Sequence, residues 1–147
     1  MLLHLEHPDT AVAEVARVLA PGGRAAFWEP DFDAFMIDSD DLAVARAVRD
    51  ALTAGLRNPD IGRRLPRLLA GAGLEVAEVT GRAVPAPGLA HAQAQFHLFD
   101  HLDTAVRHGA VTARRASAWR QQIQAADTAG HAVVTPVAFR VIAAKPA

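Results

Sequence analysis

The chain has 147 residues, of which 51% are apolar and 21% are charged, and this balance excludes a disordered protein. Its net charge of −1 gives no broad attraction to nucleic acid or to an anionic membrane, and the absence of cysteine excludes disulfides and thiolate metal sites. No apolar run approaches the ~18 residues of a membrane span, and the start MLLHLEHPD lacks the basic and apolar regions of a secretory signal. We therefore expect a cytoplasmic protein that contacts neither nucleic acid nor membrane.

A helix, a glycine turn and a strand are predicted first. Asp9 is a suitable N-cap, and apolar residues follow it at helical spacing: Val12, Val15, Ala16 and Leu19. Pro21-Gly22-Gly23 ends this helix, and residues 24–29 (RAAFWE) are expected to form a strand. Because Ala25 to Trp28 are all apolar, we expect both faces of this strand to be covered, as in a parallel sheet. Residues 31–38 are expected to form a loop.

Two helices and a second strand are predicted in the middle of the chain. Ser39, with Asp40 and Asp41, opens a helix that runs to about Gly55. Asn58-Pro59-Asp60 is a turn signal. Residues 61–72 are expected to be helical, with regular helix starting only near Arg64 or Leu65 because of Pro66. Residues 74–79 are expected to form the second strand.

The last part of the chain predicts two more helices and a third strand. A long helix follows Pro85 and Pro87, and its apolar stripe consists of Leu89, Ala92, Phe96, Phe99 and Val106. Gly109 ends it, and Thr112 caps a fourth helix. Residues 132–144 are expected to form the longest strand, in which Pro136 requires a bulge or a solvent-facing position. Since no linker is evident, we interpret residues 1–147 as a single α/β domain.

Two glycine clusters, Gly22-Gly23 and Gly71-Ala72-Gly73, are not phosphate-binding loops. Such a loop needs the order strand, glycines, helix, because the helix N-terminus must face the anion. Both clusters follow a helix and precede a strand, so we interpret them as helix C-caps in the left-handed conformation. Spacing and composition alone therefore indicate no cofactor site.

Three segments resemble class I S-adenosylmethionine-dependent methyltransferases of the type 11, or UbiE-like, branch. Residues 2–33 (LLHLEHPDTAVAEVARVLAPGGRAAFWEPDFD) are similar to the family's helix, "R-V-L-x-P-G-G" turn and strand 5. The matching positions are Glu14, Arg17, Val18, Leu19 and Pro21-Gly22-Gly23, followed by Arg24 to Glu29. Residues 58–76 look like the helix that leads into strand 6, and residues 132–147 look like strand 7 and the usual C-terminal end.

The resemblance implies a partial Rossmann-like sheet of strands 5, 6 and 7 with flanking helices, and a helical insertion at about residues 86–131 that covers the substrate. The family's glycine-rich loop after strand 1 and its acidic residue after strand 2 have no counterpart, so the chain looks like the C-terminal half of such an enzyme. S-adenosylmethionine is thus implied at the family level, and we expect this chain alone neither to bind it nor to be active. Strand 5 would lack strand 4 beside it, and an open apolar edge favours a homo-oligomer or pairing with a missing N-terminal half.

Glu29 and Asp31 are the candidate catalytic residues. They lie at the carboxyl end of a strand, where ligands of open α/β sheets gather, and a carboxylate there can orient a nucleophile or act as a general base. The alternative is that Glu29-Pro30-Asp31 is a turn whose carboxylates cap a loop.

The segment His4-Leu5-Glu6 is the candidate for cofactor contact. The resemblance places it just after strand 4, near the methionine end of the cofactor. His4 and His7 with the intervening Glu6 also suggest zinc, but a third ligand and supporting contacts are needed, so we predict no metal. A partly solvated N-terminal segment is the plainer alternative.

Trp28, Phe32, Arg63, His97 and His101 are the candidate substrate-binding residues. Trp28 and Phe32 are suited to a pocket wall or to the core. Arg63 and Arg64 can reach an anion, although adjacent arginines on a helix more often face solvent. His97 and His101 lie four residues apart, on one face of the predicted third helix, where they can line a pocket or remain partly solvated.

The resemblance implies methyl transfer from a sulfonium to a small-molecule acceptor, a reaction that depends mostly on positioning and needs no protein nucleophile. The alternative is a non-catalytic half-domain that associates with itself or with a partner, and a third possibility is a small-ligand binder that uses the helical insertion.

Overall fold

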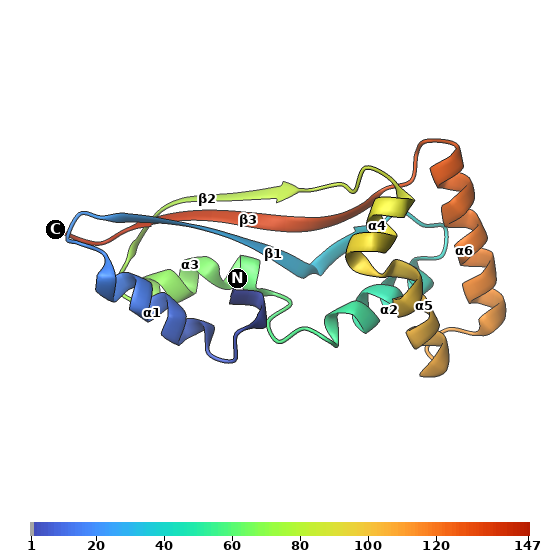
Figure 1. Ribbon diagram of the computed structural model, residues 1–147, viewed down its shortest axis with the longest axis horizontal. Helices are drawn as coiled ribbons and strands as arrows, with labels where there is room; N and C mark the ends of the chain where they lie inside the picture. The colour runs from blue at the N-terminus through green and yellow to red at the C-terminus, as the bar shows by residue number, and fades with distance from the viewer. Residues whose placement is uncertain (1) are drawn as a thin grey trace. The chain divides into compact units, whose positions relative to one another are not determined.

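A computed structural model describes residues 2–147, as ten elements shown in Figure 1. Their bounds are η1 Leu2–His4, α1 Pro8–Val18, β1 Arg24–Ile37, α2 Leu42–Thr53, α3 Ile61–Gly71, β2 Glu75–Ala83, α4 Leu89–Phe96, α5 Leu98–Arg107, α6 Ala113–Thr128 and β3 Val134–Ala144. The chain divides into two compact units, and the single-domain organisation stays a prediction. Unit 1 holds residues 1–32, 56–83 and 137–147, and unit 2 holds residues 33–55 and 84–136.

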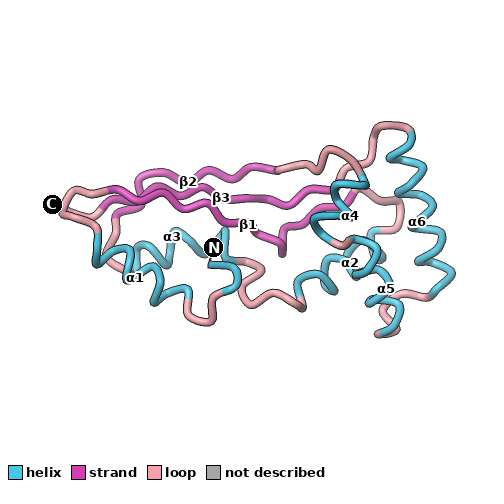
Figure 2. The backbone as a smooth tube through the Cα atoms, viewed as in Figure 1, coloured by secondary structure: helices cyan, strands magenta, loops and turns pink. Residues whose placement is uncertain are grey.

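The three strands form one sheet in the order β1-β3-β2, and they run side by side in Figure 2. Strand β2 pairs antiparallel with β3, from Glu75 opposite Ala144 to Ala83 opposite Val137. The Gly22 N–H donates to the Lys145 carbonyl at 3.0 Å and the Lys145 N–H donates to the Gly23 carbonyl at 2.8 Å, so β1 begins where β3 ends and is also antiparallel to it. This arrangement confirms the expected partial Rossmann-like α/β sheet, with the C-terminal strand in the middle.

Strand β1 is longer and more exposed than predicted. It continues through Pro30 to Ile37, so the expected loop at residues 31–38 is wrong. Proline is tolerated because β1 lies at the edge of the described sheet. The expectation that both faces are covered is wrong as well. Helices α1 and α3 lie on one side of the sheet (Figure 1), and Trp28, whose neighbour Phe27 packs against the core of unit 1, is 52% exposed.

The core of unit 1 lies between the sheet and the helices α1 and α3. Its buried members are Leu2, Leu3, Val12, Ala16, Ile61, Leu65, Leu69, Leu74, Val141 and Ala143. Helix α1 starts at Pro8 with His7 in the N-cap position, two residues before the predicted N-cap Asp9. Helix α3 starts at Ile61 despite Pro66, because contacts to β1 hold its first turn.

Unit 2 contains α2 and the helices α4, α5 and α6, which confirms a helical segment after residue 86. The predicted single long helix from Leu89 to Val106 is wrong, because His97 takes a left-handed backbone conformation with φ of 49° and separates α4 from α5. The predicted Thr112 cap is confirmed, since its hydroxyl accepts the Arg115 N–H at 3.3 Å. Phe99 packs edge-on against Trp119, with ring centroids 6.5 Å apart.

The glycine interpretation is confirmed where a left-handed backbone is required. Gly22 has a φ of 74° after α1, and Gly73 has a φ of 80° after α3. Both positions end a helix and lead into a strand, so neither presents a helix N-terminus to an anion. Within residues 2–147, no helix has the length and apolar character needed to cross a membrane.

Candidate functional site

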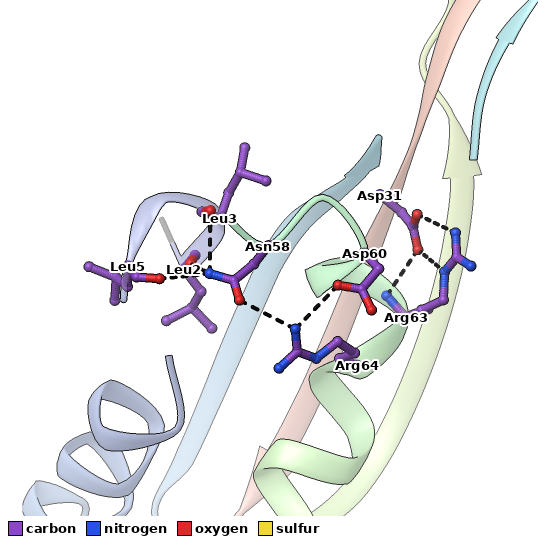
Figure 3. Close-up of polar contacts among 8 residues, drawn as sticks. All are labelled: Leu2, Leu3, Leu5, Asp31, Asn58, Asp60, Arg63 and Arg64. Carbon is purple, nitrogen blue, oxygen red and sulfur yellow. Dashed lines mark hydrogen bonds and ion pairs between the residues drawn. The ribbon is translucent and has the colours of Figure 1, made fainter. Parts of the chain in front are cut away.

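Asp31 and Arg63 form an ion pair that joins β1 to the first turn of α3. The Asp31 side chain is fully buried, and Arg63 covers it with two hydrogen bonds, Nε to Oδ2 at 2.5 Å and Nη2 to Oδ1 at 2.6 Å (Figure 3). The Arg63 N–H also donates to Oδ2, at 3.3 Å, so the carboxylate lies at the N-terminus of a helix, where negative charge is favoured. The pair therefore brings together one candidate catalytic residue and one candidate substrate-binding residue.

Glu29 is the second candidate catalytic residue, and its side chain is 4% exposed. Its Oε1 accepts the backbone N–H of Leu2 at 2.6 Å, which ties β1 to the start of the chain. Its Oε2 is buried and has no hydrogen-bond partner among the described residues. One oxygen is thus used to hold a backbone segment, and the other is an unused acceptor.

Asn58 lies at the centre of a network that the sequence indicated only as a turn (Figure 3). Its side chain is 7% exposed, and its Nδ2 contacts the carbonyl oxygens of Leu2, Leu3 and Leu5 at 3.3, 3.5 and 2.7 Å. On its other side, the Arg64 Nη1 donates to Asn58 Oδ1 at 3.3 Å and to Asp60 Oδ1 at 3.2 Å. Arg64 therefore binds within unit 1 and does not simply face solvent.

The candidate cofactor residues lie in the segment that Asn58 holds. His4 ends η1, and both it and Glu6 are exposed, while Leu5 is 39% exposed. Leu2 and Leu3, just before them, are buried in the core of unit 1. The segment is anchored by its leucines and its backbone, and it leaves His4 and Glu6 accessible to another molecule.

Trp28 and Phe32 have different surroundings on β1. Trp28 is 52% exposed, and because successive strand residues point to opposite faces, it lies on the face opposite to Phe27, which packs against the core of unit 1. Phe32 is half-buried against the core of unit 1, and its N–H donates to the Pro59 carbonyl at 2.8 Å. Trp28 therefore presents an apolar ring to solvent, whereas Phe32 contributes to packing.

His97 and His101 belong to unit 2 and are not on one continuous helix, so the prediction of a shared helix face is wrong. His97 is exposed at the junction of α4 and α5, and its Nδ1 lies 3.2 Å from Asp100 Oδ2. His101 is half-buried on α5. Burial, aided by the like charge of His97, lowers the pKa of His101, while Asp100 opposes this shift.

A shallow depression of about 350 Å³ lies on unit 2 and is lined by Asp40, Asp41, Arg115, Ala118, Trp119 and Gln122. Arg115 forms an ion pair with Asp41 at 2.7 Å, and these hydrogen bonds hold the pKa of Asp41 below its usual value. The Trp119 Nε1–H donates to Ser39 Oγ at 2.8 Å. Asp41 and Arg115 are thus already paired with each other, and the Trp119 N–H is already bonded.

No group of three or more His, Asp or Glu side chains within residues 2–147 is placed to hold a metal ion. The roles expected for the candidate catalytic, cofactor and substrate residues stay predictions. Asn58 is the residue that sequence reasoning missed, because a lone Asn before Pro signals a turn and gives no sign of partners more than fifty residues away.

The sheet order and the flanking helices define an α/β fold with a partial Rossmann-like sheet. A solved structure from Bacillus halodurans C-125 (BH2331), described as a "putative methyltransferase", shares this fold with a TM-score of 0.52 and 17% sequence identity. The alignment covers 99% of this chain and 66% of that chain. The (4+2)-cyclase SpnF aligns with a TM-score of 0.42 and 19% identity, over 99% of this chain and 47% of its own.

Among curated proteins, the chain is similar to the "Uncharacterized 37.1 kDa protein in transposon TN4556" of Streptomyces fradiae, with 46% identity over 80 residues. That match covers 54% of this chain and 23% of the relative, so the chain spans less than a quarter of the relative's length. No protein-family profile matches the sequence.

Proposed function

We propose that the chain is the acceptor-facing part of an S-adenosylmethionine-dependent methyltransferase that acts on a small molecule in the cytoplasm. The observation that carries this proposal is the sheet, with β3 antiparallel between β1 and β2, in a fold shared with BH2331 over 99% of the chain. The BH2331 chain is longer than the aligned region, which covers 66% of it, and this supports the proposal that a further segment completes the fold.

We propose that the residues of this chain do not hold S-adenosylmethionine by themselves. Gly22, Gly73, Gly109 and Gly130, the glycines with positive φ, all follow helices, so none of them opens a helix toward an anion. In the candidate cofactor segment His4-Leu5-Glu6, the Leu5 carbonyl already accepts a hydrogen bond from Asn58. The His4 and Glu6 side chains are exposed on the surface. We therefore propose that the donor is held mainly by the further segment, and we derive no chemical step through it.

The contribution of this chain would then be to position and shield the acceptor. Good orientation of two reactants supplies ~7–11 kcal/mol of a barrier, and methyl transfer needs no nucleophile from the protein. The helices α4, α5 and α6 would select the acceptor. Glu29 and Asp31 lie within β1, which continues to Ile37, so the expectation that they end a strand is wrong. Glu29 still keeps one unused carboxylate oxygen, and we retain it with Asp31 as a candidate proton acceptor.

Calorimetry with S-adenosylhomocysteine tests this proposal on the 147-residue chain and on the same chain extended by any upstream in-frame coding sequence. We expect no binding heat from the 147-residue chain and micromolar affinity from the extended one. Micromolar affinity in the shorter chain would contradict the division of the site between segments. An extended chain that contains a glycine-rich strand-loop-helix and still binds nothing would contradict the methyltransferase proposal itself.

The exposed Trp28 at the edge strand favours a second candidate function, a self-associating or partner-binding half-domain. This function needs no methyl donor, and the state of association of the chain distinguishes it from the methyltransferase proposal.

A further inference from the structure

The start of the chain is held by two buried polar side chains that come from distant parts of the sequence. Glu29 Oε1 accepts the Leu2 N–H at 2.6 Å, and Asn58 contacts the carbonyls of Leu2, Leu3 and Leu5 through its Nδ2. The Asn58 N–H also donates to the Leu3 carbonyl, at 3.1 Å. We refer to Glu29, Asn58 and residues 2–5 together as the N-terminal clamp.

The orientation of the Asn58 amide is fixed from its opposite side. Arg64 can only donate, so the oxygen of the amide must face its Nη1, at 3.3 Å, and the Nδ2 must face the carbonyl oxygens. Arg64 is in turn held by Asp60 Oδ1 at 3.2 Å. All of these contacts are consistent with one orientation of the amide. In that orientation the Asn58 Nδ2 faces the backbone of residues 2–5 (Figure 3).

Apolar packing alone does not account for this arrangement. Leu2 and Leu3 are 7% and 3% exposed and already anchor the segment in the core. Burial of an amide and a carboxylate beside them costs free energy unless both are well bonded, and an apolar residue would fill the same space at lower cost. What the polar groups add is a fixed backbone path through Leu5, which leaves His4 and Glu6 exposed.

We propose that Asn58 is a positioning residue that fixes the backbone of residues 2–5 and thereby sets where His4, Leu5 and Glu6 meet the methyl donor. The donor contact rests on the proposed function, whereas the control of the backbone rests on the hydrogen bonds alone. Asn58 itself is 7% exposed and acts through the segment that it holds, so it is not assigned a catalytic role.

The test replaces the amide by a carboxylate of the same shape. Asn58→Asp removes the Nδ2 donor and turns a negative charge toward the carbonyls, whereas Arg64→Leu keeps that donor and removes the support of the amide oxygen together with the ion pair to Asp60. Gln124→Glu, the same chemical change at an exposed site on α6, is the matched control. Amide hydrogen exchange is measured for Leu5, whose N–H donates to the Leu2 carbonyl at 3.1 Å, and S-adenosylhomocysteine affinity is measured in the donor-binding form of the protein.

We expect Asn58→Asp to speed exchange at Leu5 by about tenfold and to weaken the affinity by a similar factor, with a smaller effect for Arg64→Leu and none for Gln124→Glu. Exchange in β3 should stay unchanged. Unaltered exchange at Leu5, exchange that rises equally throughout the protein, or faster exchange with unaltered affinity would each overturn the positioning role. The wild-type protein is measured first. If it binds no S-adenosylhomocysteine, that result contradicts the proposed function, independently of the variants.

Discussion

The carboxylate of Asp31 is fully buried, whereas the Arg63 side chain that pairs with it is 47% exposed. Removal of the arginine would leave a buried negative charge without its bidentate hydrogen-bond donor. Such a loss lowers the stability of the fold even when one partner is partly screened by water. We predict that Arg63→Ala lowers the free energy of unfolding by about 1–3 kcal/mol, measured by urea denaturation.

A matched control for Arg63→Ala exists in unit 1. Arg17 pairs with Glu14 at 2.7 Å, but both side chains are exposed, so Arg17→Ala should cause no measurable change. Equal effects of the two substitutions would show that the buried pair contributes no more than a surface pair. If Arg63→Ala changes the free energy of unfolding only slightly but abolishes acceptor binding, the result would favour the substrate role expected for Arg63.

The residues of this region could be chosen from the sequence, but their contacts could not. The apolar run before Glu29 and Asp31 marks both as candidate residues, and both are buried in the structure, at 4% and 0% exposure. Nothing local indicates that Glu29 accepts from Leu2 or that Asn58 contacts Leu5, because these partners are brought together only by the packing of η1 against β1 and α3. Tertiary hydrogen bonds of this kind leave no periodic signal.

The packing of α3 on β1 depends on Gly62. A Cβ at this position would lie 2.9 Å from the Phe139 ring, and 3.0 Å from each of the Glu29 and Pro30 carbonyl oxygens, which cannot move without distorting the strand. Gly71, at the other end of the same helix, has open space around it. We predict that Gly62→Ala destabilises by about 1–3 kcal/mol, whereas Gly71→Ala stabilises by about 0.4–1 kcal/mol. Urea denaturation of both variants checks this prediction. An unchanged free energy of unfolding in Gly62→Ala would show that α3 can shift away from the sheet.

His101 on helix α5 makes the stability of unit 2 depend on pH. Burial and His97 lower the pKa of His101 in the folded protein, while the unfolded chain takes up its proton near the ordinary value of ~6.5. Below that value, the unfolded state therefore binds more protons than the folded state. The stability that neutral His101 contributes is fully present above the ordinary pKa and declines as the pH falls toward the lowered pKa. We predict a larger drop in melting temperature from neutral pH to about pH 5 for the wild type than for His101→Gln. His131→Gln, at an exposed position, should leave the wild-type drop intact, and identical profiles for all three proteins would refute the effect.

Element positions were largely predictable, and the exceptions share a cause. The strand at Arg24, the cap at Thr112 and the glycine stops at Gly22 and Gly73 follow from local preferences that tertiary structure did not override. The break at His97 was missed because histidine rarely takes a positive φ, so the residue carries no signal that a glycine would have given. The extension of β1 through Pro30 was missed because an edge strand tolerates proline and a central one does not.

The two edges of the sheet differ across the molecule. Strand β2 carries Glu75, Glu78 and Arg82, and charges on an edge oppose pairing with another chain, whereas β1 presents Ala25 to Trp28 without a charge. We predict that the chain forms a concentration-dependent dimer through β1, seen by analytical ultracentrifugation, and that Trp28→Lys shifts it to a monomer because a lysine on the edge is costly to bury. Val79→Lys, which alters a 49% exposed residue of β2, should leave the dimer in place. A wild type that is monomeric at every concentration would remove the support for self-association and leave β1 as the edge that the further segment of a methyltransferase would cover.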